Sequence, residues 1–404
     1  MWRSAIGWSL AVALCVSTAN AQESPWELRV LPGEEDWVLS DAQGLNDAGD
    51  VVGVYAPDRY DRTRAVLWRD GTWIDLGATI GEPEGTLTSW ASTIDGAGRV
   101  GGSVTTKLFS DPTSRTTATV WDTVAGSWTD LHPPGPDYVQ STIYAGNDVG
   151  QLVGIVVPEG GAAAQPYVWD LTTGTGRVLP TPDGFMEATG SAISNTGWVS
   201  GSAGNYVPGQ LETYLFHAVI WGPDGSVRDL HAEVAAVLPD IQSSFAGAIE
   251  EDGRVFGLAR TDPVWWNETN QHYLWVWTEA GGVEVLDTGG TRMPNGGGSN
   301  GRLAVGTVGV IGPDTVQPAV WVDGSLHVLP GMTGFGNHTC RAVNSRGVIV
   351  GDAVFSGGTW WWQGSRAFIA EPRTDADYDG DALLDAWELQ GYTHDNGAQV
   401  DLFG

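Results

Sequence analysis

The sequence predicts an all-β protein, a seven-bladed β-propeller of four-stranded blades that is closed by an N-terminal strand. Three observations predict this fold. A nine-residue box recurs seven times, the same two apolar segments follow it, and a spare copy of the last segment stands near the start of the chain. Repeats of about 40–50 residues that hold four short strands are typical of propellers. An open β-solenoid or a pair of β-sandwiches is the alternative architecture.

The first element of each repeat is predicted to be a β-hairpin. In LNDAGDVVG (45–53) a polar residue starts the turn, the middle glycine supplies the positive φ that ends it, and an apolar strand follows. The closing glycine is expected where two backbones approach closely. The sixth copy departs from this pattern, because Arg302 stands at the middle glycine position. The boxes end at Gly53, Gly102, Gly154, Gly201, Gly257, Gly306 and Gly351, which are 45 to 56 residues apart.

Two short apolar strands are predicted after each box. The first ends in tryptophan in six copies, as in AVLW (65–68), whereas the seventh copy is AFIA (367–370). The second resembles GSLHVLP (324–330), and the seventh repeat has none, because the chain turns after Ala370 to EPRTDADYDGD, which does not suit a strand. WELRVLP (26–32) matches the missing segment. We therefore expect it to pair with the last repeat and close the ring, which removes open sheet edges.

The repeats resemble the HAF family of extracellular repeats. The pattern of that family is an I-N-x-x-G-x-V-V-G box, a His-Ala-Phe-type strand that ends in tryptophan, and a D-L strand. The fullest match is FHAVIW (216–221), and the resemblance covers about residues 26–371. It implies a repeat scaffold and no particular reaction, so no catalytic role is carried over to this chain.

The first residues have the three regions of a signal peptide. Arg3 supplies the positive charge, an apolar run follows at 5–17, and Ala19-Asn20-Ala21 gives the small-x-small cleavage pattern. We expect residues 1–21 to be removed and the protein to be secreted, to the extracellular space or to the periplasm or cell envelope. Cys340 is then the only cysteine left, so no intramolecular disulfide is expected.

The charge of the chain excludes two classes of partner. The net charge is −30 and the sequence pI is about 4.2. Such a surface repels nucleic acid and anionic membranes. No later segment has the 18 or so uninterrupted apolar residues of a membrane span, so no membrane insertion is expected. The oligomeric state is not indicated.

The acidic tail has the ligand spacing of an EF-hand-type calcium loop, with oxygen ligands at positions 1, 3, 5, 7, 9 and 12. The predicted ligands are Asp377, Asp379, Asp381, the carbonyl of Leu383, Asp385 and Glu388. The segment resembles the D-x-D-x-D-G-L-x-D-x-W-E boxes of secreted bacterial proteins, which are related to thrombospondin type 3 repeats. Ala382 replaces the usual glycine of the loop, and the alternative is an acidic solvated linker. We expect a propeller over residues 22–372 and a Ca²⁺-binding tail over 373–404.

Long aromatic loops are expected on one face of the ring. The loops between the second and third strands of all blades emerge on the same face, and several carry tyrosine or tryptophan. Exposed aromatic side chains gathered on one face indicate a binding surface. The alternative is that they cover the edges of the blades. The candidate binding residues are Tyr55, Tyr60, Tyr206, Tyr214, Trp265, Trp266, Trp360, Trp361 and Trp362.

The sequence favours a protein that is not an enzyme and that serves as a ligand-binding or protein-interaction module. Its ligand, a carbohydrate or a protein, is not indicated. GGSNG (297–301) matches a nucleophile motif, but it lies on the turn of the sixth box, without the strand and helix that a nucleophile elbow needs.

Two other functions stay open. One is a propeller hydrolase or lyase that acts on a polysaccharide, with Glu34, Glu35 and Asp36 as candidate carboxylates. The other is a role in assembling the cell envelope. A converging pair of carboxylates on the aromatic face would favour the enzyme.

The calcium loop generates the first prediction. Titration with Ca²⁺ should release heat and raise the helicity of the tail, measured by calorimetry and circular dichroism. Glu388→Gln should weaken binding by about tenfold or more, because it removes the bidentate ligand. Asp401→Asn, in the degenerate stretch that follows, is the matched control and should bind as the wild type does. Absence of both heat and added helicity would contradict the metal site.

Overall fold

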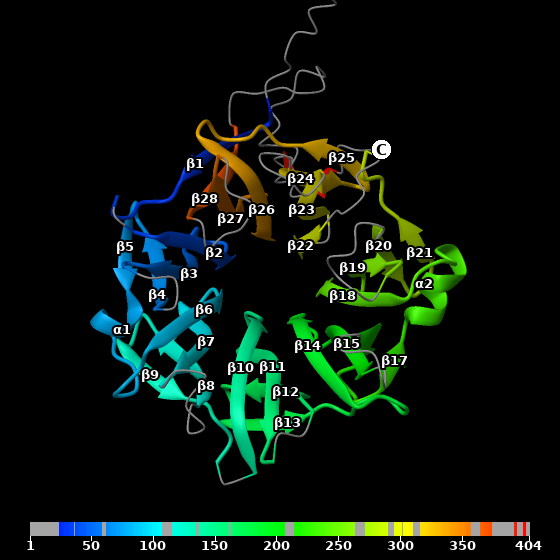
Figure 1. Ribbon diagram of the computed structural model, residues 1–404, viewed down its shortest axis with the longest axis horizontal. Coiled ribbons are helices and arrows are strands. Elements are labelled where there is room, and N and C mark those ends of the chain that lie inside the picture. The colour runs from blue at the N-terminus through cyan, green and yellow to red at the C-terminus, as the bar shows by residue number, and fades with distance from the viewer. Residues whose placement is uncertain are drawn as a thin grey trace, which may run out of the picture.

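The structure is a computed structural model, and it confirms the β-propeller (Figure 1). It describes residues 24–373 except 36, 59–61, 107–114, 135–136, 161–162, 207–213, 263–270, 290–294, 301, 310–315 and 357–363, together with 392–393 and 399–400. The predicted signal peptide lies outside the described residues. Within the described part, no helix is long and apolar enough to cross a membrane.

The described strands of the ring form five four-stranded sheets and one eight-stranded sheet. The eight-stranded sheet consists of two groups of four, joined by a single parallel pair, Leu39 with Ser365. We interpret each group of four as a blade, so that each box of the sequence has its own blade. The first strand of each group lies nearest the centre of the ring, and the last lies at the rim (Figure 1).

The strands of the first four blades follow the chain in order. The first blade holds β2 (Leu39–Leu45), β3 (Val51–Ala56), β4 (Arg64–Arg69) and β5 (Thr72–Asp75), followed by helix α1 (Leu76–Thr79). The second holds β6 (Thr88–Ile94), β7 (Arg99–Thr105), β8 (Thr116–Asp122) and β9 (Ser127–Asp130). The third holds β10 (Tyr138–Gly146), β11 (Gln151–Pro158), β12 (Gln165–Asp170) and β13 (Thr175–Val178). The fourth holds β14 (Glu187–Ile193), β15 (Val199–Tyr206), β16 (Tyr214–Trp221) and β17 (Val227–Asp229), followed by helix α2 (His231–Val237).

The remaining blades repeat this order. The fifth holds β18 (Ser243–Ile249), β19 (Val255–Arg260), β20 (His272–Thr278) and β21 (Gly282–Val285). The sixth holds β22 (Asn295–Ser299), β23 (Leu303–Gly309), β24 (Val316–Val322) and β25 (Ser325–Val328). The last holds β26 (Phe335–Val343), β27 (Ile349–Phe355), β28 (Ser365–Pro372) and, from the other end of the chain, β1 (Trp26–Val30). A separate hairpin of β29 (Tyr392–Thr393) and β30 (Gln399–Val400) lies in the tail.

The N-terminal strand closes the ring as predicted. β1 pairs with β28 in an antiparallel register that runs from Trp26 opposite Pro372 to Val30 opposite Phe368. The expectation that the strand ends at Ala370 is wrong, because β28 continues to Pro372. The extra residues stay extended since β1 lies alongside them, and Arg29 pairs with Glu371 at 3.0 Å.

The repeated tryptophans connect each of the first six blades to the segment that precedes it. In the first blade the indole Nε1 of Trp68 donates to the carbonyl of Pro32, which follows β1, at 2.7 Å. The same bond recurs from Trp121 to Gly81, Trp169 to Leu131, Trp221 to Pro180 and Trp321 to Asp287, at 2.6 to 3.0 Å. Trp277 instead donates to the Glu233 carboxylate of α2 at 2.8 Å. A buried indole N–H needs a partner, so the linker that follows each outer strand is held in place.

The box glycines have the roles that the sequence predicts. The six middle glycines have φ between 74° and 94°, a region that favours glycine. A side chain at the closing glycine would collide with the neighbouring strand, since a Cβ on Gly102 would lie 1.9 Å from the carbonyl oxygen of Trp90. Gly53, Gly154, Gly201 and Gly351 meet the same obstacle at 1.8 to 2.0 Å.

The sixth box lacks the middle glycine because its turn is shorter than the turns of the other boxes. In the first box the turn comprises the five residues from Asn46 to Asp50, with the N–H of Asn46 donating to the carbonyl of Asp50. In the sixth, the N–H of Asn300 donates to the carbonyl of Leu303, so the turn is one residue shorter. Arg302 therefore lies in a different turn and does not replace a middle glycine.

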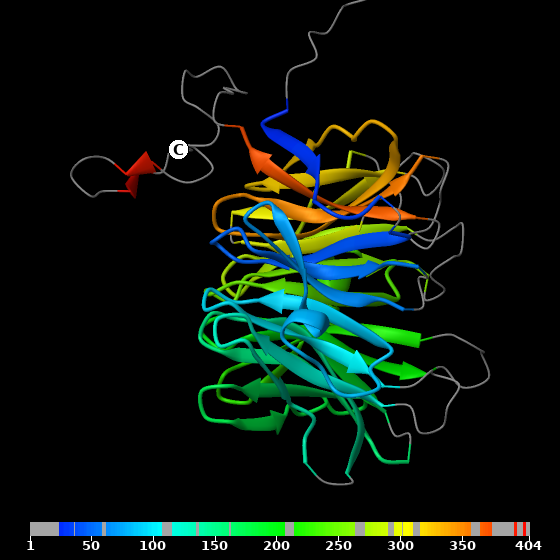
Figure 2. The ribbon, with the colours of Figure 1, turned by 90° about the vertical axis from the view of Figure 1, so that its left-hand side faces the viewer.

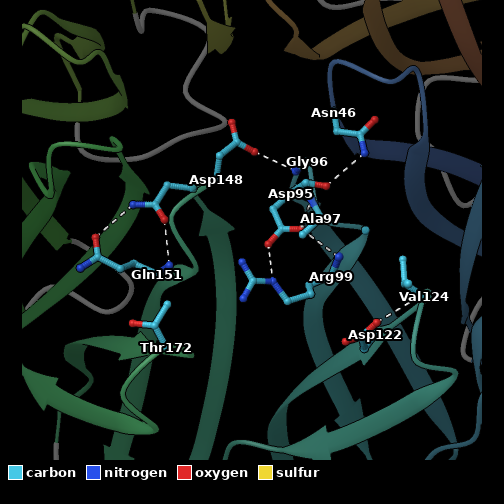
Figure 3. A network of polar contacts seen from close by, with 12 residues as sticks. Asn46, Asp95, Gly96, Ala97, Arg99, Asp122, Val124, Asp148, Gln151 and Thr172 are labelled. Carbon is cyan, nitrogen blue, oxygen red and sulfur yellow. Dashed lines mark hydrogen bonds and ion pairs between the residues drawn. The ribbon is translucent and has the colours of Figure 1, made fainter.

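Hydrogen bonds between successive box turns connect the blades (Figure 3). Asn46 Nδ2 donates to the carbonyl of Asp95 at 3.1 Å, and the N–H of Gly96 donates to Asp148 Oδ1 at 2.8 Å. Across the seam between the last and first blades, Asn344 Nδ2 donates to the carbonyl of Asn46 at 3.1 Å. Asn46 and Asn344, which open their turns, thus serve the ring as well as their own hairpins.

Closure by β1 generates the second prediction. A mature chain that starts at residue 33 should lose about 4 kcal/mol or more of unfolding free energy relative to one that starts at 22, measured by urea denaturation. The deletion removes the ladder with β28, the buried Trp26 and the Pro32 acceptor of Trp68. Arg29→Ala is the control and should cost less than about 1 kcal/mol, because its ion pair is exposed. An unchanged urea midpoint for the shortened chain would contradict the role of the strand.

Candidate functional site

Most of the residues predicted to form sites lie outside the described part of the chain. This holds for the six predicted calcium ligands, Asp377 to Glu388, and for Tyr60, Trp265, Trp266, Trp360, Trp361 and Trp362. Tyr206 and Tyr214 are the facing ends of β15 and β16, where they pair in register. Tyr55 is 7% exposed, stacks on Trp37 with ring centroids 4.3 Å apart, and donates to Asp75 at 2.6 Å. Tyr55 therefore packs inside the first blade. The prediction that it is an exposed aromatic residue of the binding face is wrong.

The carboxylates of the rival enzyme hypothesis lie in the segment that joins β1 to β2. Glu34 and Glu35 are exposed there, and Asp36 lies outside the described residues. The nucleophile motif belongs to a hairpin as predicted, because Ser299 is in β22, pairs with Ala304 of β23, and hydrogen-bonds to Glu250.

Two serine–histidine pairs support the blades. His132 Nδ1 lies 2.8 Å from Ser141 Oγ, and this hydroxyl also accepts the backbone N–H of Ala118. His231 and Ser244 repeat the arrangement at 2.8 Å two blades later. Both serines are fully buried, so they hold neighbouring blades together and are not placed to attack a substrate.

Every inner strand carries a β-bulge at the same place. In β2, Ala42 pairs with Gly53 and Gly44 pairs with Val52, so that Gln43 is an extra residue. The other inner strands have the same register shift. We call the extra residues the bulge ring: Gln43, Ser92, Tyr144, Ser191, Gly247, Gly297, Gly298 and Arg341. Bulges redirect side chains and are common beside functional sites.

The bulge ring faces solvent at the centre of the propeller. The inner strands surround the axis (Figure 1), and the bulge residues are exposed or partly exposed, whereas the residue before the bulge is buried in six of the seven strands. Tyr144 is 41% exposed, yet burial raises the pKa of its phenol. Solvent therefore reaches the Tyr144 side chain even though protein atoms crowd its phenol group.

The chemistry of the bulge ring differs from blade to blade. It presents an amide, two hydroxyls, a phenol and a guanidinium, and three glycines complete it on the fifth and sixth blades. The rest of the repeat is nearly constant, since the turn residues, closing glycines and tryptophans recur. Variation at one position of an otherwise repeated unit is typical of a binding site built on a scaffold.

A buried acid pair holds the only charged residue of the bulge ring. Arg341 Nη2 lies 3.0 Å from Asp352 Oδ1 and 3.3 Å from Asp41 Oδ2, and Gln43 Nε2 donates to Asp41 at 2.7 Å. Burial raises the pKa of Asp41 to about 8; the Arg341 guanidinium opposes this shift and the neighbouring Asp352 adds to it. Both carboxylates raise the pKa of Arg341. At neutral pH the cluster therefore holds a protonated Asp41 beside an Arg341–Asp352 ion pair.

Among the described residues, two hollows lie between neighbouring blades. One of about 510 Å³ separates β9 from β12 and β13 and is lined by side chains that include Tyr167, Trp169 and His132. Another, of about 40 Å³, lies near Arg302 and Trp321 and has room for about one water molecule.

The comparisons with known proteins identify the fold. No family model matches the chain, and no curated protein matches it. The chain is similar to the β-propeller domain of the Trilobed protease from Pyrococcus furiosus, described as having an open velcro topology (TM-score 0.51, 11% identity, 84% of this chain and 99% of that one). It is also similar to Pyrococcus horikoshii acylaminoacyl peptidase (TM-score 0.50, 12% identity, 85% of this chain), of which it spans only 53%.

A further similar structure is an oligogalacturonate lyase from Vibrio parahaemolyticus (TM-score 0.49, 14% identity, 86% of this chain and 96% of that one). Because all these identities are low, the likeness shows the fold alone: the chain is a β-propeller. The particular function has to be argued from the residues of this chain.

A position of the repeat upstream of the box marks the bulge ring in the sequence. The extra residue stands three positions before the residue that opens each box turn, as Gln43 does before Asn46 and Arg341 before Asn344. Aligning the repeats upstream of the box would have shown a column with variable chemistry between small or apolar neighbours. The partnership of Arg341 with Asp41 carries no such signal, because about 300 residues separate them.

The acid pair generates the third prediction. Between about pH 4 and 8 the unfolded chain releases the Asp41 proton while the folded protein keeps it, so the free energy of unfolding falls as pH rises. Asp41→Asn cannot titrate and should lose this part of the pH dependence. Its stability relative to the wild type should rise by about 2 kcal/mol or more from pH 5 to 9, measured by urea denaturation. Asp183→Asn, at an exposed position, is the control, and its free energy of unfolding should depend on pH as that of the wild type does. If this pH dependence is the same for all three proteins, Asp41 does not keep its proton on folding.

Proposed function

We propose that this protein is an extracellular, non-enzymatic binding module whose ligand contacts the bulge ring at the centre of the propeller. The observation that carries the proposal is the bulge ring itself. Seven inner strands carry a bulge at the same register position, and the polar groups there differ while the supporting repeat stays constant. A rigid scaffold that displays varied polar groups suits recognition of one ligand.

The geometry of the central carboxylates supports a binding role over glycoside hydrolysis. A pair of catalytic carboxylates flanks the scissile bond, about 5 Å apart in retaining enzymes and about 6.5–9.5 Å apart in inverting ones. Asp41 and Asp352 are buried and both contact the same nitrogen of Arg341, so the guanidinium occupies the space between them. A sugar has no access to that space.

Export and calcium binding belong to the same proposal. The signal-peptide pattern of residues 1–21 supports an extracellular or envelope location, and the ligand spacing from Asp377 to Glu388 supports calcium binding by the tail. A net charge of −30 suits a protein that works outside the cell without nucleic acid or anionic lipid partners.

The fourth prediction tests this function. The purified mature protein is screened against an array of glycans and cell-envelope polymers, together with Tyr144→Ala. This variant should keep the melting temperature, because Tyr144 is 41% exposed and lies outside the strand ladder, and should bind the selected ligand at least tenfold more weakly, about 1.4 kcal/mol. Met186→Gln, at a position that is 67% exposed and outside the bulge ring, is the matched control.

Two results would overturn the proposal. If every ligand in the array binds Tyr144→Ala as tightly as it binds the wild type, the bulge ring is not the binding site. If polymers are shortened during incubation, measured as new reducing ends or unsaturated products, the protein is an enzyme and the rival hypothesis holds.

A further inference from the structure

Arg341 is the only charged side chain of the bulge ring, and it sets the charge of the site. Its side chain is 35% exposed, although Asp41 and Asp352 both contact its Nη2. The acid pair thus fixes the guanidinium at one nitrogen while the side chain stays partly exposed. A fixed, partly desolvated guanidinium is a favourable partner for a carboxylate.

The other groups of the bulge ring suit hydroxyl groups. Gln43, Tyr144 and Ser191 can each donate and accept hydrogen bonds, and the phenol ring of Tyr144 offers an apolar face. Ser92 can accept a hydrogen bond, because its hydroxyl already donates to the carbonyl of Ile143. On the fifth and sixth blades, Gly247, Gly297 and Gly298 carry no side chain. A Cβ on Gly297 would lie 2.4 Å from the carbonyl oxygen of Cys340, so the glycines of the sixth blade let its inner strand lie close to β26. The ring therefore has one site for an anion and several for neutral polar groups.

We propose that the ring centre binds a hydroxylated carboxylic acid of the sugar-acid class, whose carboxylate pairs with Arg341 and whose hydroxyls contact Gln43, Ser92 and Tyr144. The inference rests on the proposed function, because it names the ligand class of the same site. A cation is disfavoured because Arg341 repels it. A dianionic phosphate is less suited, because a single guanidinium that already contacts two carboxyl groups has to balance its charge.

The proton on Asp41 follows from the charges around it. The ionisable groups next to Asp41 are Arg341 on β26 and Asp352 on β27, and His338 and Cys340 of β26 lie next to Asp352. Oδ1 of Asp41 has no hydrogen-bond partner among the described residues, so nothing there stabilises a second negative charge. An added carboxylate at Arg341 further disfavours ionised Asp41. Binding near pH 8 should therefore take up protons from the buffer.

Glucuronate and glucose are matched probes, since they differ by a carboxylate in place of a hydroxymethyl group. Calorimetry should show glucuronate binding at least tenfold more tightly than glucose to the wild type. The double variant Arg341→Gln/Asp352→Asn replaces the ion pair with neutral amides and should bind both sugars equally, with circular dichroism to confirm that it is folded. The single variant Arg341→Lys keeps the charge and should retain part of the preference.

The proton linkage is measured at pH 8 in phosphate and Tris, two buffers that differ in ionisation enthalpy. The heat of glucuronate binding should differ between these buffers for the wild type and should not differ for Asp41→Asn, which should still prefer glucuronate. Identical heats in both buffers for the wild type would overturn the linkage.

The failures of the two proposals are distinguishable. Equal affinity for both sugars, or binding of neither, would overturn the ligand class. The proposed function is decided separately, by whether Tyr144→Ala weakens the binding of the array ligands. A glucuronate preference that survives the double variant would overturn the role of Arg341.

Discussion

The pairing of β1 with β28 is the constraint on which the rest of the molecule depends. It completes the last blade, and the linker that follows β1 then supplies the Pro32 carbonyl to Trp68 of the first blade. The second, third, fourth and sixth blades repeat this bond between a tryptophan and a carbonyl of the preceding linker. The turn-to-turn bond from Asn344 to Asn46 closes the same seam on the inner side. Closure at one seam thus fixes the relative position of all the inner strands, and with it the geometry of the bulge ring.

The bulge ring shows how a repeated fold can carry a specific site. Residues within the strand ladder must match the pleat, the neighbouring blade and the closing glycine, which explains their repetition. A bulged residue is outside the ladder, so its side chain is free of these demands. Changing Gln43 or Tyr144 to another residue would leave the hairpins intact, whereas changing Gly102 would force two backbones apart. Specificity can therefore vary where stability is least affected.

Much of the fold could be predicted from the sequence, and less of the site. The boxes, the tryptophan strands and the closing strand at Trp26 are local patterns that recur, so counting them was enough. The bulges escaped prediction because one added residue hardly changes the pattern of polar and apolar positions. The shorter turn at Asn300 was hidden by an alignment anchored on its closing glycine. The burial of Tyr55 depends on Trp37 and Asp75, whose positions only the folded blade defines.

The antiparallel closure also determines how the protein responds to mechanical load. The chain enters the ring at Trp26 directly opposite Pro372, where it leaves, and Arg373 N–H donates to the carbonyl of Pro25 at 2.8 Å. β1 and β28 lie side by side, so both ends of the propeller emerge at one point (Figure 2). A force that separates these ends would open the ladder one pair at a time, as in unzipping, and would never load all its hydrogen bonds together. The strand that makes the ring stable in solution is therefore its weakest element under tension between its two ends.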